Sequence, residues 1–328
     1  MDEPTPPLPP PLPPGLSQEG APTVFTIAPP PLPPPLPILL PFPGFLQSLL
    51  VIAILMAVQL LVVAVAYAIS PPLIANPVTL GIANIVSFAA ACLFAARRSG
   101  YPLGQLFRQA PPAGTFQPWS VVALLQGILG QLLCSVGLIY AIGGKAVEKS
   151  DYVDRLNKLL GPGQSLWAVI PLLVIVAPFT EETLFRGQFL RGFLGRYSPP
   201  LAIALSAALF SAVHMNPVQI PATFMLGILS GFLYLRTRSI WPSIGAHMLN
   251  NAFPALAVMA AASRAKPAAK AGGTPEMTTA AALGLIVLGL SIWLLSLYSL
   301  RQWLPSAGPV EPPRTPEPVS PWASPESS

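Results

Sequence analysis

The sequence predicts an all-α protein, a polytopic membrane helix bundle of about eight transmembrane helices with disordered Pro-rich tails. Hydrophobic residues make up 53% of the 328 residues and charged residues only 9%, whereas soluble domains carry about 25% charged residues. The mean hydropathy is +0.63. Apolar runs long enough to cross a hydrocarbon layer of about 30 Å also recur along the chain. These observations exclude an ordinary soluble domain.

The predicted spans are apolar runs that tolerate glycine and proline, because neighbouring helices can satisfy the backbone groups that these residues free. The runs cover residues 45–69, 77–96, 119–142, 166–190, 200–216, 218–235, 240–262 and 278–300. Counting Lys and Arg between the runs gives ten on one side and seven on the other. We therefore expect an integral, multi-pass membrane protein with both termini in the cytoplasm.

Proline sets both ends of the chain apart from its centre. Of the 44 prolines, 18 fall in residues 1–44 and 8 in residues 304–328. Such segments favour solvated polyproline II and cannot build a core, so we expect a disordered tail (1–44), a helical domain (45–303) and a second disordered tail (304–328). SH3-like or WW-like domains are candidate partners of the tails, although plain disordered segments are the favoured interpretation. The basic residues are scattered singly, which argues against nucleic acid as a partner.

Rare polar residues inside the apolar runs are the main guide to function. The chain has two histidines, His214 and His247, and both fall in apolar runs. Of its twelve acidic residues, only Glu181 and Glu182 do so. Ionisable groups at membrane depth are costly and usually face the bundle interior at a functional site. We therefore expect these four side chains to converge.

Helical spacing suggests how the polar residues divide. Glu182 and Arg186 are four apart with the acid first, which is the favourable order, so we expect them to neutralise each other and brace the helix. Glu181 lies about 100° around the helix from Glu182 and is left to face a cavity. His247 and Asn251 are also four apart and share one face of their helix.

One geometric difficulty concerns depth. On this topology Glu181 lies near the cytoplasmic end of its span, whereas His214, about fourteen residues into the next span, lies ~20 Å deeper. We expect the fourth and fifth helices to extend beyond the bilayer, or the span limits to shift, so that a water-filled chamber forms part-way down. Phe210, one turn before His214, is expected to pack beneath its ring.

Three short motifs resemble those of one protein family. "EETLFR" (181–186) is similar to the EExxxR motif of the CPBP family, which groups CAAX-prenyl-protease-like and bacteriocin-processing (Abi-like) intramembrane proteases. "FSAVH" (210–214) resembles its FxxxH motif, and "HMLNN" (247–251) resembles its HxxxN motif. The resemblance covers about residues 166–256, which we take as the motif-bearing core, and three motifs in order are more specific than any one of them.

The resemblance implies that Glu181 and His214 activate a water and that His247 and Asn251 stabilise the oxyanion. A carboxylic acid removed from water has a raised pKa and can act as a general base, while imidazole and amide groups can donate to an oxyanion. A rival arrangement makes Glu181, His214 and His247 ligands of a Zn²⁺ ion with water in the fourth position. Sequence spacing does not decide between them, because HExxH is absent.

The function that these residues favour is intramembrane endopeptidase activity. By resemblance the reference activity is that of a type II CAAX prenyl endopeptidase, so the expected partners are membrane lipids and a peptide or lipidated protein substrate, prenylated or not. Two other classes remain open. One is a non-enzymatic membrane scaffold or immunity-type protein that uses its tails, and the other is a proton-coupled transporter, which the lack of internal repeats weakly disfavours.

Overall fold

The computed structural model of the chain describes residues 42–148, 166–264 and 277–307. By its contacts the chain divides into two units, Met1–Leu39 and Leu40–Ser328. The first unit lies wholly outside the described residues, so the description that follows concerns the second unit alone. The predicted proline-rich tails also lie almost entirely outside the described residues, and their disorder stays a prediction.

Helices account for the regular structure of the described residues, which contain no strand, and the predicted all-α class is confirmed. The first half holds α1 (Phe45–Ile69), α2 (Pro77–Ser99), α3 (Leu103–Arg108) and α4 (Pro118–Glu148), with a 3₁₀ turn at Pro71–Ala75. The second half holds α6 (Leu166–Pro171), α7 (Ala177–Leu184), α8 (Arg191–Leu194), α9 (Pro199–Ala212), α10 (Ile220–Thr237), α11 (Trp241–Arg264) and α12 (Thr279–Trp303). Two π-helical segments, Leu172–Val176 and Phe185–Leu190, join α6, α7 and α8 into one helix.

Local sequence explains where several helices begin and end. The side chain of Asn76 accepts a hydrogen bond from Val78 N–H at 2.8 Å, and Pro77 occupies the first turn of α2, where its missing N–H costs nothing. Gly100 ends α2 with φ of 66°, a left-handed conformation that glycine adopts without strain. Thr278 caps α12 by accepting from Ala281 N–H at 3.2 Å.

The predicted count of eight transmembrane helices is not confirmed. Each predicted run is helical, but among the described residues five helices are long and apolar enough to cross a membrane. They are Phe45–Ile69, Pro77–Ser99, Pro118–Ile142, Ile220–Thr237 and Thr279–Trp303. The three other runs are the ones that carry the motif residues: the helix 166–194, α9 with only 14 residues, and α11. A helix that lines a polar site between other helices does not need an apolar surface all round.

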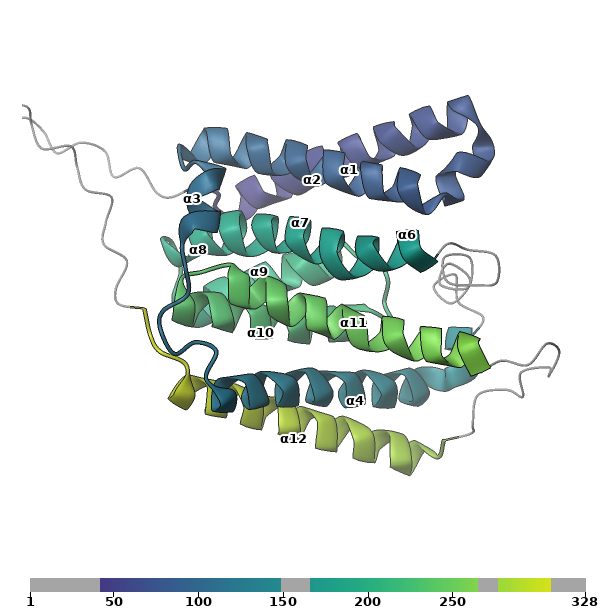
Figure 1. Cartoon of the computed structure of the whole chain (residues 1–328), viewed down its shortest axis with the longest axis vertical. Helices are drawn as coiled ribbons and strands as arrows, with labels where there is room; N and C mark the ends of the chain where they lie inside the picture. The colour runs from purple at the N-terminus through teal and green to yellow at the C-terminus, as the bar shows by residue number, and fades with distance from the viewer. Residues whose placement is uncertain (1–41, 149–165, 265–276, 308–328) are drawn as a thin grey trace, which may run out of the picture. The chain divides into compact units, whose positions relative to one another are not determined.

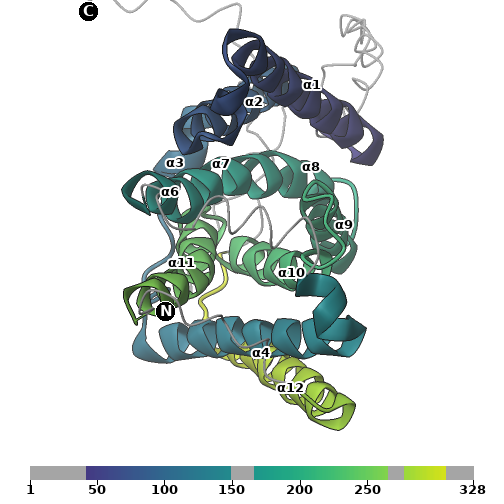
Figure 2. The same cartoon turned by 90° about the vertical axis from the view of Figure 1, so that its right-hand side faces the viewer.

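The helices are arranged in layers in Figures 1 and 2. The antiparallel pair α1 and α2 forms one outer layer, and the closely packed pair α4 and α12 forms the opposite one. The helix 166–194 and the helices α9, α10 and α11 lie between these two pairs. The motif-bearing segments are therefore sandwiched between apolar helices, which positions the polar residues in the interior.

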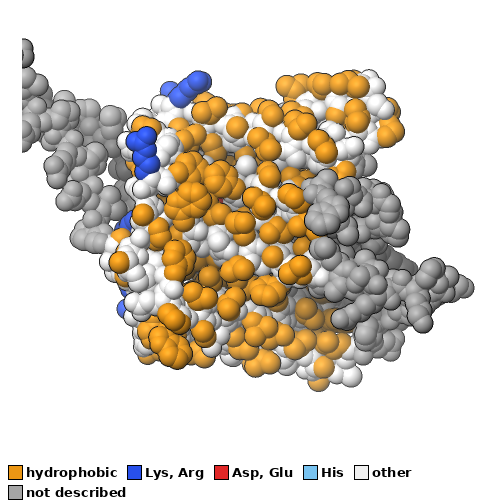
Figure 3. Space-filling model, viewed as in Figure 1, with side chains coloured by type: hydrophobic (Ala, Val, Ile, Leu, Met, Phe, Trp, Pro, Cys, Tyr) orange, Lys and Arg blue, Asp and Glu red, His pale blue; other side chains and the backbone are white. Residues whose placement is uncertain are grey.

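Basic residues gather at one end of the described helices. Arginines stand at the C-terminal ends of α2, α3, α8, α10 and α12: Arg97, Arg98, Arg108, Arg191, Arg196, Arg236, Arg238 and Arg301. Contacts such as Ser239 Oγ to Gln109 O at 2.6 Å and Trp241 Nε1 to Phe107 O at 3.1 Å tie these ends together. Figure 3 shows Lys and Arg at one edge of a face that is otherwise largely apolar. Together with the five apolar helices, this surface marks an integral membrane protein; that the basic end is cytoplasmic stays a prediction.

The helix bounds remove the predicted depth difficulty. The helix that carries Glu181 continues to Leu194, so Glu181 lies thirteen residues, or about 20 Å, from its basic end. The next helix, α9, begins at that same end at Pro199, and His214 follows its last turn, fifteen residues or about 22 Å further on. The two side chains therefore reach the same depth. The expectation that Glu181 lies near the end of its span was wrong, because the span was ended four residues too early.

Candidate active site

Two π-helical segments flank the turn that carries the paired carboxylates. In Leu172–Val176 the helix uses i→i−5 hydrogen bonds, and Ala177 N–H accordingly donates to Leu172 O. A second segment, Phe185–Leu190, follows α7 directly. Short π-segments inside α-helices are rare and occur often at functional sites. Here they bracket Glu181 and Glu182, and each leaves backbone carbonyls without their usual helical donors.

Asn251 donates a hydrogen bond to one of the backbone carbonyls that the first π-segment leaves without a helical donor. Ala177 N–H is committed to Leu172 O, and Pro178, the next residue, has no N–H, so neither residue can donate to Leu173 O. The side chain of Asn251 donates from Nδ2 to Leu173 O at 2.9 Å. The π-segment and the proline together thus create an acceptor on the helix 166–194, and Asn251 of α11 donates to it.

Glu182 and Arg186 form the ion pair that their spacing predicts. Arg186 Nη1 donates to Glu182 Oε1 at 3.0 Å, and both side chains are completely buried. Arg186 Nη2 also donates to Gly227 O of α10 at 3.1 Å, and its guanidinium lies 4.7 Å from the centre of the Phe210 ring. The arginine thereby ties the helix 166–194 to both α9 and α10, which agrees with a bracing role.

Glu182 has a second contact that the sequence did not indicate. Its Oε1 atom lies 2.9 Å from His247 Nδ1, whereas Glu181 Oε2 lies 3.8 Å from His247 Nε2. The expected division, in which Glu182 serves only Arg186, is therefore incomplete. Because an ionised carboxylate only accepts hydrogen bonds, the Nδ1 atom of His247 carries a proton. Glu182 holds the orientation of this imidazole and leaves Nε2 facing Glu181.

Phe210 contacts both histidine rings edge-on. Its ring centre lies 5.1 Å from that of His214 and 5.5 Å from that of His247, at interplanar angles of 79° and 87°. His214 Nδ1 donates to Phe210 O at 2.8 Å, since a carbonyl oxygen can only accept. The Nε2 atom of His214 is thus the ring nitrogen without a hydrogen bond to any described residue, and the Nε2 atom of His247 has only the 3.8 Å contact with Glu181. The predicted packing of Phe210 on His214 is present, and Phe210 also spaces the two rings.

A cavity of ≈ 590 Å³ brings the predicted site residues together. Its lining includes all four predicted catalytic side chains, Glu181, His214, His247 and Asn251. The carboxylate of Glu181 is 15% exposed, the most accessible of the charged groups in this cluster, and His247 is 4% exposed. Glu181 therefore faces space that a water and a peptide bond can occupy, while Glu182 and Arg186 are sealed behind it.

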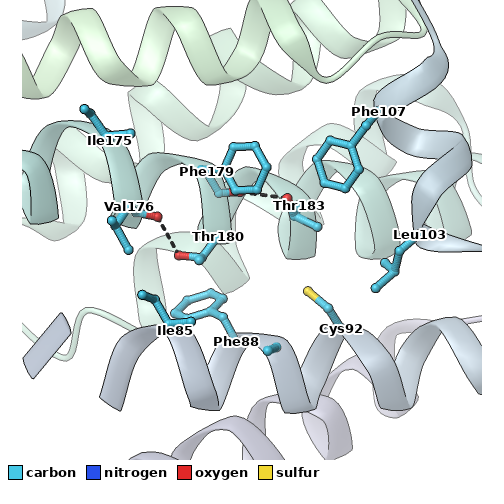
Figure 4. Close-up of a pocket in the computed structure, with 11 residues that line it drawn as sticks. Ile85, Phe88, Cys92, Leu103, Phe107, Ile175, Val176, Phe179, Thr180 and Thr183 are labelled. Carbon is cyan, nitrogen blue, oxygen red and sulfur yellow. Dashed lines mark hydrogen bonds between the residues drawn. The ribbon is translucent and has the colours of Figure 1, made fainter. Parts of the chain in front are cut away.

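An apolar pocket of ≈ 420 Å³ lies on another face of the same helix. Figure 4 shows its lining from α2, α3 and the 175–183 region, with the rings of Phe88, Phe107 and Phe179 among the side chains. Thr180 and Thr183 also line it, but their hydroxyls donate to backbone carbonyls of their own helix (Figure 4). The Thr180 hydroxyl oxygen also lies 2.9 Å from the side-chain amide of Asn84, and Asn84 lines the polar cavity. The two spaces are therefore neighbours across this one contact.

The predicted zinc alternative finds no matching geometry. Among the described residues, no three His, Cys, Asp or Glu side chains are placed so that they could hold a metal ion. Glu181, His214 and His247 share the cavity without forming such a group.

Four amide residues of the helices around the cavity escaped the sequence analysis: Gln59, Asn84, Gln131 and Asn250. Each is an uncharged amide in a long apolar helix, a residue that more often makes a helix–helix contact than a site. Asn250 adjoins Asn251 and Asn84 contacts Thr180 of α7, but neither relationship can be read without the packing. Only a search for every strongly polar residue inside the spans would have found them.

Comparison with known proteins agrees with the motifs. Residues 163–253 match the family model of "Type II CAAX prenyl endopeptidase Rce1-like", which confirms the resemblance stated for the CAAX-protease group. The matched segment begins in front of α6 and ends within α11, so it contains all three motifs and both π-segments.

Two curated relatives show the extent of the similarity. The membrane-embedded CAAX protease MroQ of Staphylococcus aureus (strain USA300) is 25% identical over 142 residues, which are 42% of this chain and 56% of the relative. YdiL of Bacillus subtilis (strain 168) is 31% identical over 88 residues, 26% of this chain and 36% of the relative. The chain thus spans little more than half the length of the first relative and about a third of the second. No solved structure matches.

Proposed function

We propose that this chain is an intramembrane endopeptidase that hydrolyses a peptide bond with a water activated by Glu181 and His214. The observation that carries the proposal is the convergence of Glu181, His214, His247 and Asn251 on one cavity between membrane helices. The family match over residues 163–253, and a relative named as a membrane-embedded CAAX protease, support the same reaction.

The protonation pattern suggests how the groups divide the work. A water between Glu181 and His214 Nε2 gives one proton to the Glu181 carboxylate, and its oxygen attacks the carbonyl carbon of the scissile bond. The carbonyl oxygen becomes an oxyanion. The same proton then passes from Glu181 to the leaving amine nitrogen as the C–N bond breaks, so the carboxylate is regenerated.

The oxyanion needs donors that are already in place. Asn251 has a second amide hydrogen beyond the one given to Leu173 O. His247 can donate from Nε2 only as an imidazolium, because its other nitrogen donates to Glu182. An imidazolium here also balances charge, since Glu181 and Glu182 together carry two negative charges against one on Arg186. In this reaction Glu182 and Arg186 position the donors without contacting the substrate.

We further propose a lipidated peptide, prenylated at a CAAX-type end, as the substrate. The apolar pocket beside the cavity presents no unpaired polar side chain, and its ≈ 420 Å³ accommodate a branched hydrocarbon chain. The contact between Thr180 and Asn84 places this pocket next to the polar cavity. A lipid chain in the pocket would hold the adjoining peptide bond near Glu181.

The decisive experiment measures cleavage by the purified full chain in detergent with quenched fluorescent peptides, each made with and without a prenyl group. Glu181→Gln should abolish cleavage, whereas Arg301→Gln, an exposed change at the basic end, should not. Failure of the wild-type chain to cleave any peptide of the set, or full activity in Glu181→Gln, would overturn the proposal.

The lipid pocket has its own test. Ala89→Trp places an indole in the apolar pocket, and Val86→Trp places it elsewhere on α2 as a matched control. We expect Ala89→Trp to raise KM for the prenylated peptide and to leave the non-prenylated peptide unaffected. Equal effects of Ala89→Trp on both peptides would contradict a lipid-binding role.

A further inference from the structure

The basic end of the helices carries a positive charge that no described carboxylate balances. Apart from Glu148, Glu181 and Glu182, the described residues contain no Asp or Glu. Glu148 ends α4 at the opposite end, and the other two lie about 20 Å from the basic end. Helix dipoles do not compensate, because the positive N-termini of α1, α4, α9 and α11 stand at this end beside the negative C-termini of α2, α10 and α12. The arginines of this end can therefore attract an anion from outside the chain.

A series of contacts brings Arg191 of α8 close to Arg238, the residue that follows α10. The guanidinium of Arg191 lies 3.2 Å from the centre of the Tyr101 ring, a cation–π contact that holds it in place. The Tyr101 hydroxyl accepts from Gln109 Nε2 at 3.0 Å, and Gln109 O accepts from Ser239 Oγ at 2.6 Å. Because Ser239 directly follows Arg238, these contacts connect one arginine to the other.

Tyr234 of α10 lies beside both arginines. Its side chain interacts electrostatically with Arg191 and with Arg238, and its backbone O accepts from Arg238 N–H at 2.8 Å. Tyr234 is only 3% exposed, but its hydroxyl retains accessible surface and hydrogen-bonds to no described residue. The hydroxyl can therefore donate to a group that the two arginines bind.

The donors of the two arginines are accessible as well. Nε of Arg238 is completely buried, but its Nη atoms, and every guanidinium nitrogen of Arg191, retain accessible surface. None of these nitrogen atoms hydrogen-bonds to a described acceptor. Two planar guanidinium groups beside a hydroxyl form a set of donors that matches the oxygens of a phosphate group.

The backbone of Arg238 is strained. It ends α10 with φ of 54°, in the left-handed region where glycine is the usual residue. A long side chain is unfavourable in this conformation. Residues kept in such a conformation often have a function that requires their side chain.

The surroundings place these groups at the membrane surface. Trp119, Trp241 and Trp303 stand at the same end and are 63%, 40% and 41% exposed, respectively. Exposed tryptophans of membrane helices lie at the level of the lipid headgroups. We propose that Arg191 and Arg238, with the hydroxyl of Tyr234, bind the phosphate of an anionic phospholipid headgroup. This site is separate from the polar cavity, and the inference does not rest on the proposed function.

The test titrates the purified full chain with phosphatidylglycerol in mixed micelles of a non-ionic detergent and follows thermal unfolding, because a ligand of the folded state raises the unfolding temperature. Phosphatidylcholine and inorganic phosphate serve as comparison ligands. We expect phosphatidylglycerol to raise the unfolding temperature of the wild type to a plateau, and the other two at equal concentration to leave it unchanged.

Three variants locate the site. Arg191→Gln and Arg238→Gly should each raise the apparent Kd for phosphatidylglycerol at least about tenfold, as expected for the loss of hydrogen bonds to a charged group. Without lipid, Arg238→Gly should be at least as stable as the wild type, because glycine adopts the left-handed conformation without strain. Arg301→Gln is the matched control, since it removes one exposed charge from the same end, and it should keep the wild-type Kd.

Three results would overturn the inference. One is an unfolding temperature that phosphatidylglycerol does not change, and another is equal stabilisation by phosphatidylcholine or inorganic phosphate. The third is an equal rise of Kd in Arg301→Gln, which would mean that diffuse positive charge attracts the lipid. If Arg191→Gln does not fold, Arg238→Gly decides, and an unchanged Kd in that variant rules out the site. None of these measurements depends on cleavage, so the proposed function is tested separately.

Discussion

Oε1 of Glu182 lies 2.9 Å from Nδ1 of His247, and the same oxygen accepts from Arg186 at 3.0 Å. One buried atom therefore joins the ion pair that braces the helix to the imidazole that faces the cavity. In a neutral amide at this position the oxygen could still accept from both groups, but Arg186 and a protonated His247 would lose their shared counter-charge.

Glu182→Gln should consequently impair both folding and catalysis. We expect kcat to fall by about 10²–10⁴-fold, as when a group that orients an active-site histidine is neutralised. Removal of one partner of a buried ion pair also costs about 3–5 kcal/mol of stability. Cleavage by the fraction of protein that elutes as folded, compared with its thermal unfolding curve in detergent, separates the two effects. A normal kcat would mean that Glu182 only balances Arg186.

Glu181→Gln should behave in the opposite way. The Glu181 carboxylate faces the cavity, and its nearest described ionic contact is His247 Nε2 at 3.8 Å, beyond hydrogen-bond reach. Loss of the charge therefore disturbs little packing but removes the general base. A fall in the cleavage rate of about 10²–10⁴-fold is expected from the loss of such a base. An unfolding temperature equal to that of the wild type, together with lost cleavage, is the expected pair of results. A lowered unfolding temperature would assign Glu181 a structural role instead.

Pro178 and Asn251 should show coupled effects on stability. Asn251→Ala leaves Leu173 O without a donor, whereas Pro178→Ala restores an N–H on the same helix that can reach that carbonyl. We expect the double variant to be more stable than the sum of the single changes predicts, by about 1 kcal/mol. A double-mutant cycle of thermal unfolding measures this coupling. Strict additivity would show that the π-segment, and not the proline, keeps the carbonyl free.

Gly130 should be intolerant of any larger side chain. A Cβ atom there would lie 2.6 Å from Gly289 O and 2.6 Å from Trp293 N, so the backbones of α4 and α12 meet at this point. Small residues permit such close approach between membrane helices. Gly130→Val should lower the unfolding temperature and, because Gln131 is the next residue, also lower cleavage. Gly284→Val on α12 is the matched control, since a Cβ there meets nothing within 4 Å, and a similar loss in this variant would count against the packing argument.

Much of the helical arrangement follows from hydropathy, and the reason is physical. A membrane helix must be apolar over about twenty residues, so α1 begins and ends where its apolar run does, at residues 45 and 69. The same rule gives the wrong limit for the helix that carries Glu181, which continues through Arg186 and Arg191 to Leu194. Charged residues in that stretch are satisfied by contacts such as Glu182 with Arg186, which no hydropathy value records.

The residues of the candidate site could be predicted from the sequence only in part. Rarity alone identifies Glu181, His214 and His247, because ionisable groups are conspicuous in an apolar chain. Rarity does not show that Glu182 holds His247, since that contact joins residues 65 positions apart. The hydrogen bond from Asn251 to Leu173 O also cannot be predicted from the sequence, because it depends on a carbonyl freed by a change of helix type that has no reliable sequence signal.

The two π-segments also affect the phase of the helix in which they lie. Each i→i−5 segment accommodates one residue more than the α-helical turns around it, and one residue corresponds to about 100° of rotation in an α-helix. The stretches before, between and after the segments are therefore rotated out of step, so that no single stripe runs along residues 166–194. Removing one residue from 172–176 would bring the first two stretches into step and turn Leu173 away from Asn251, although every side chain named in the site would still be present.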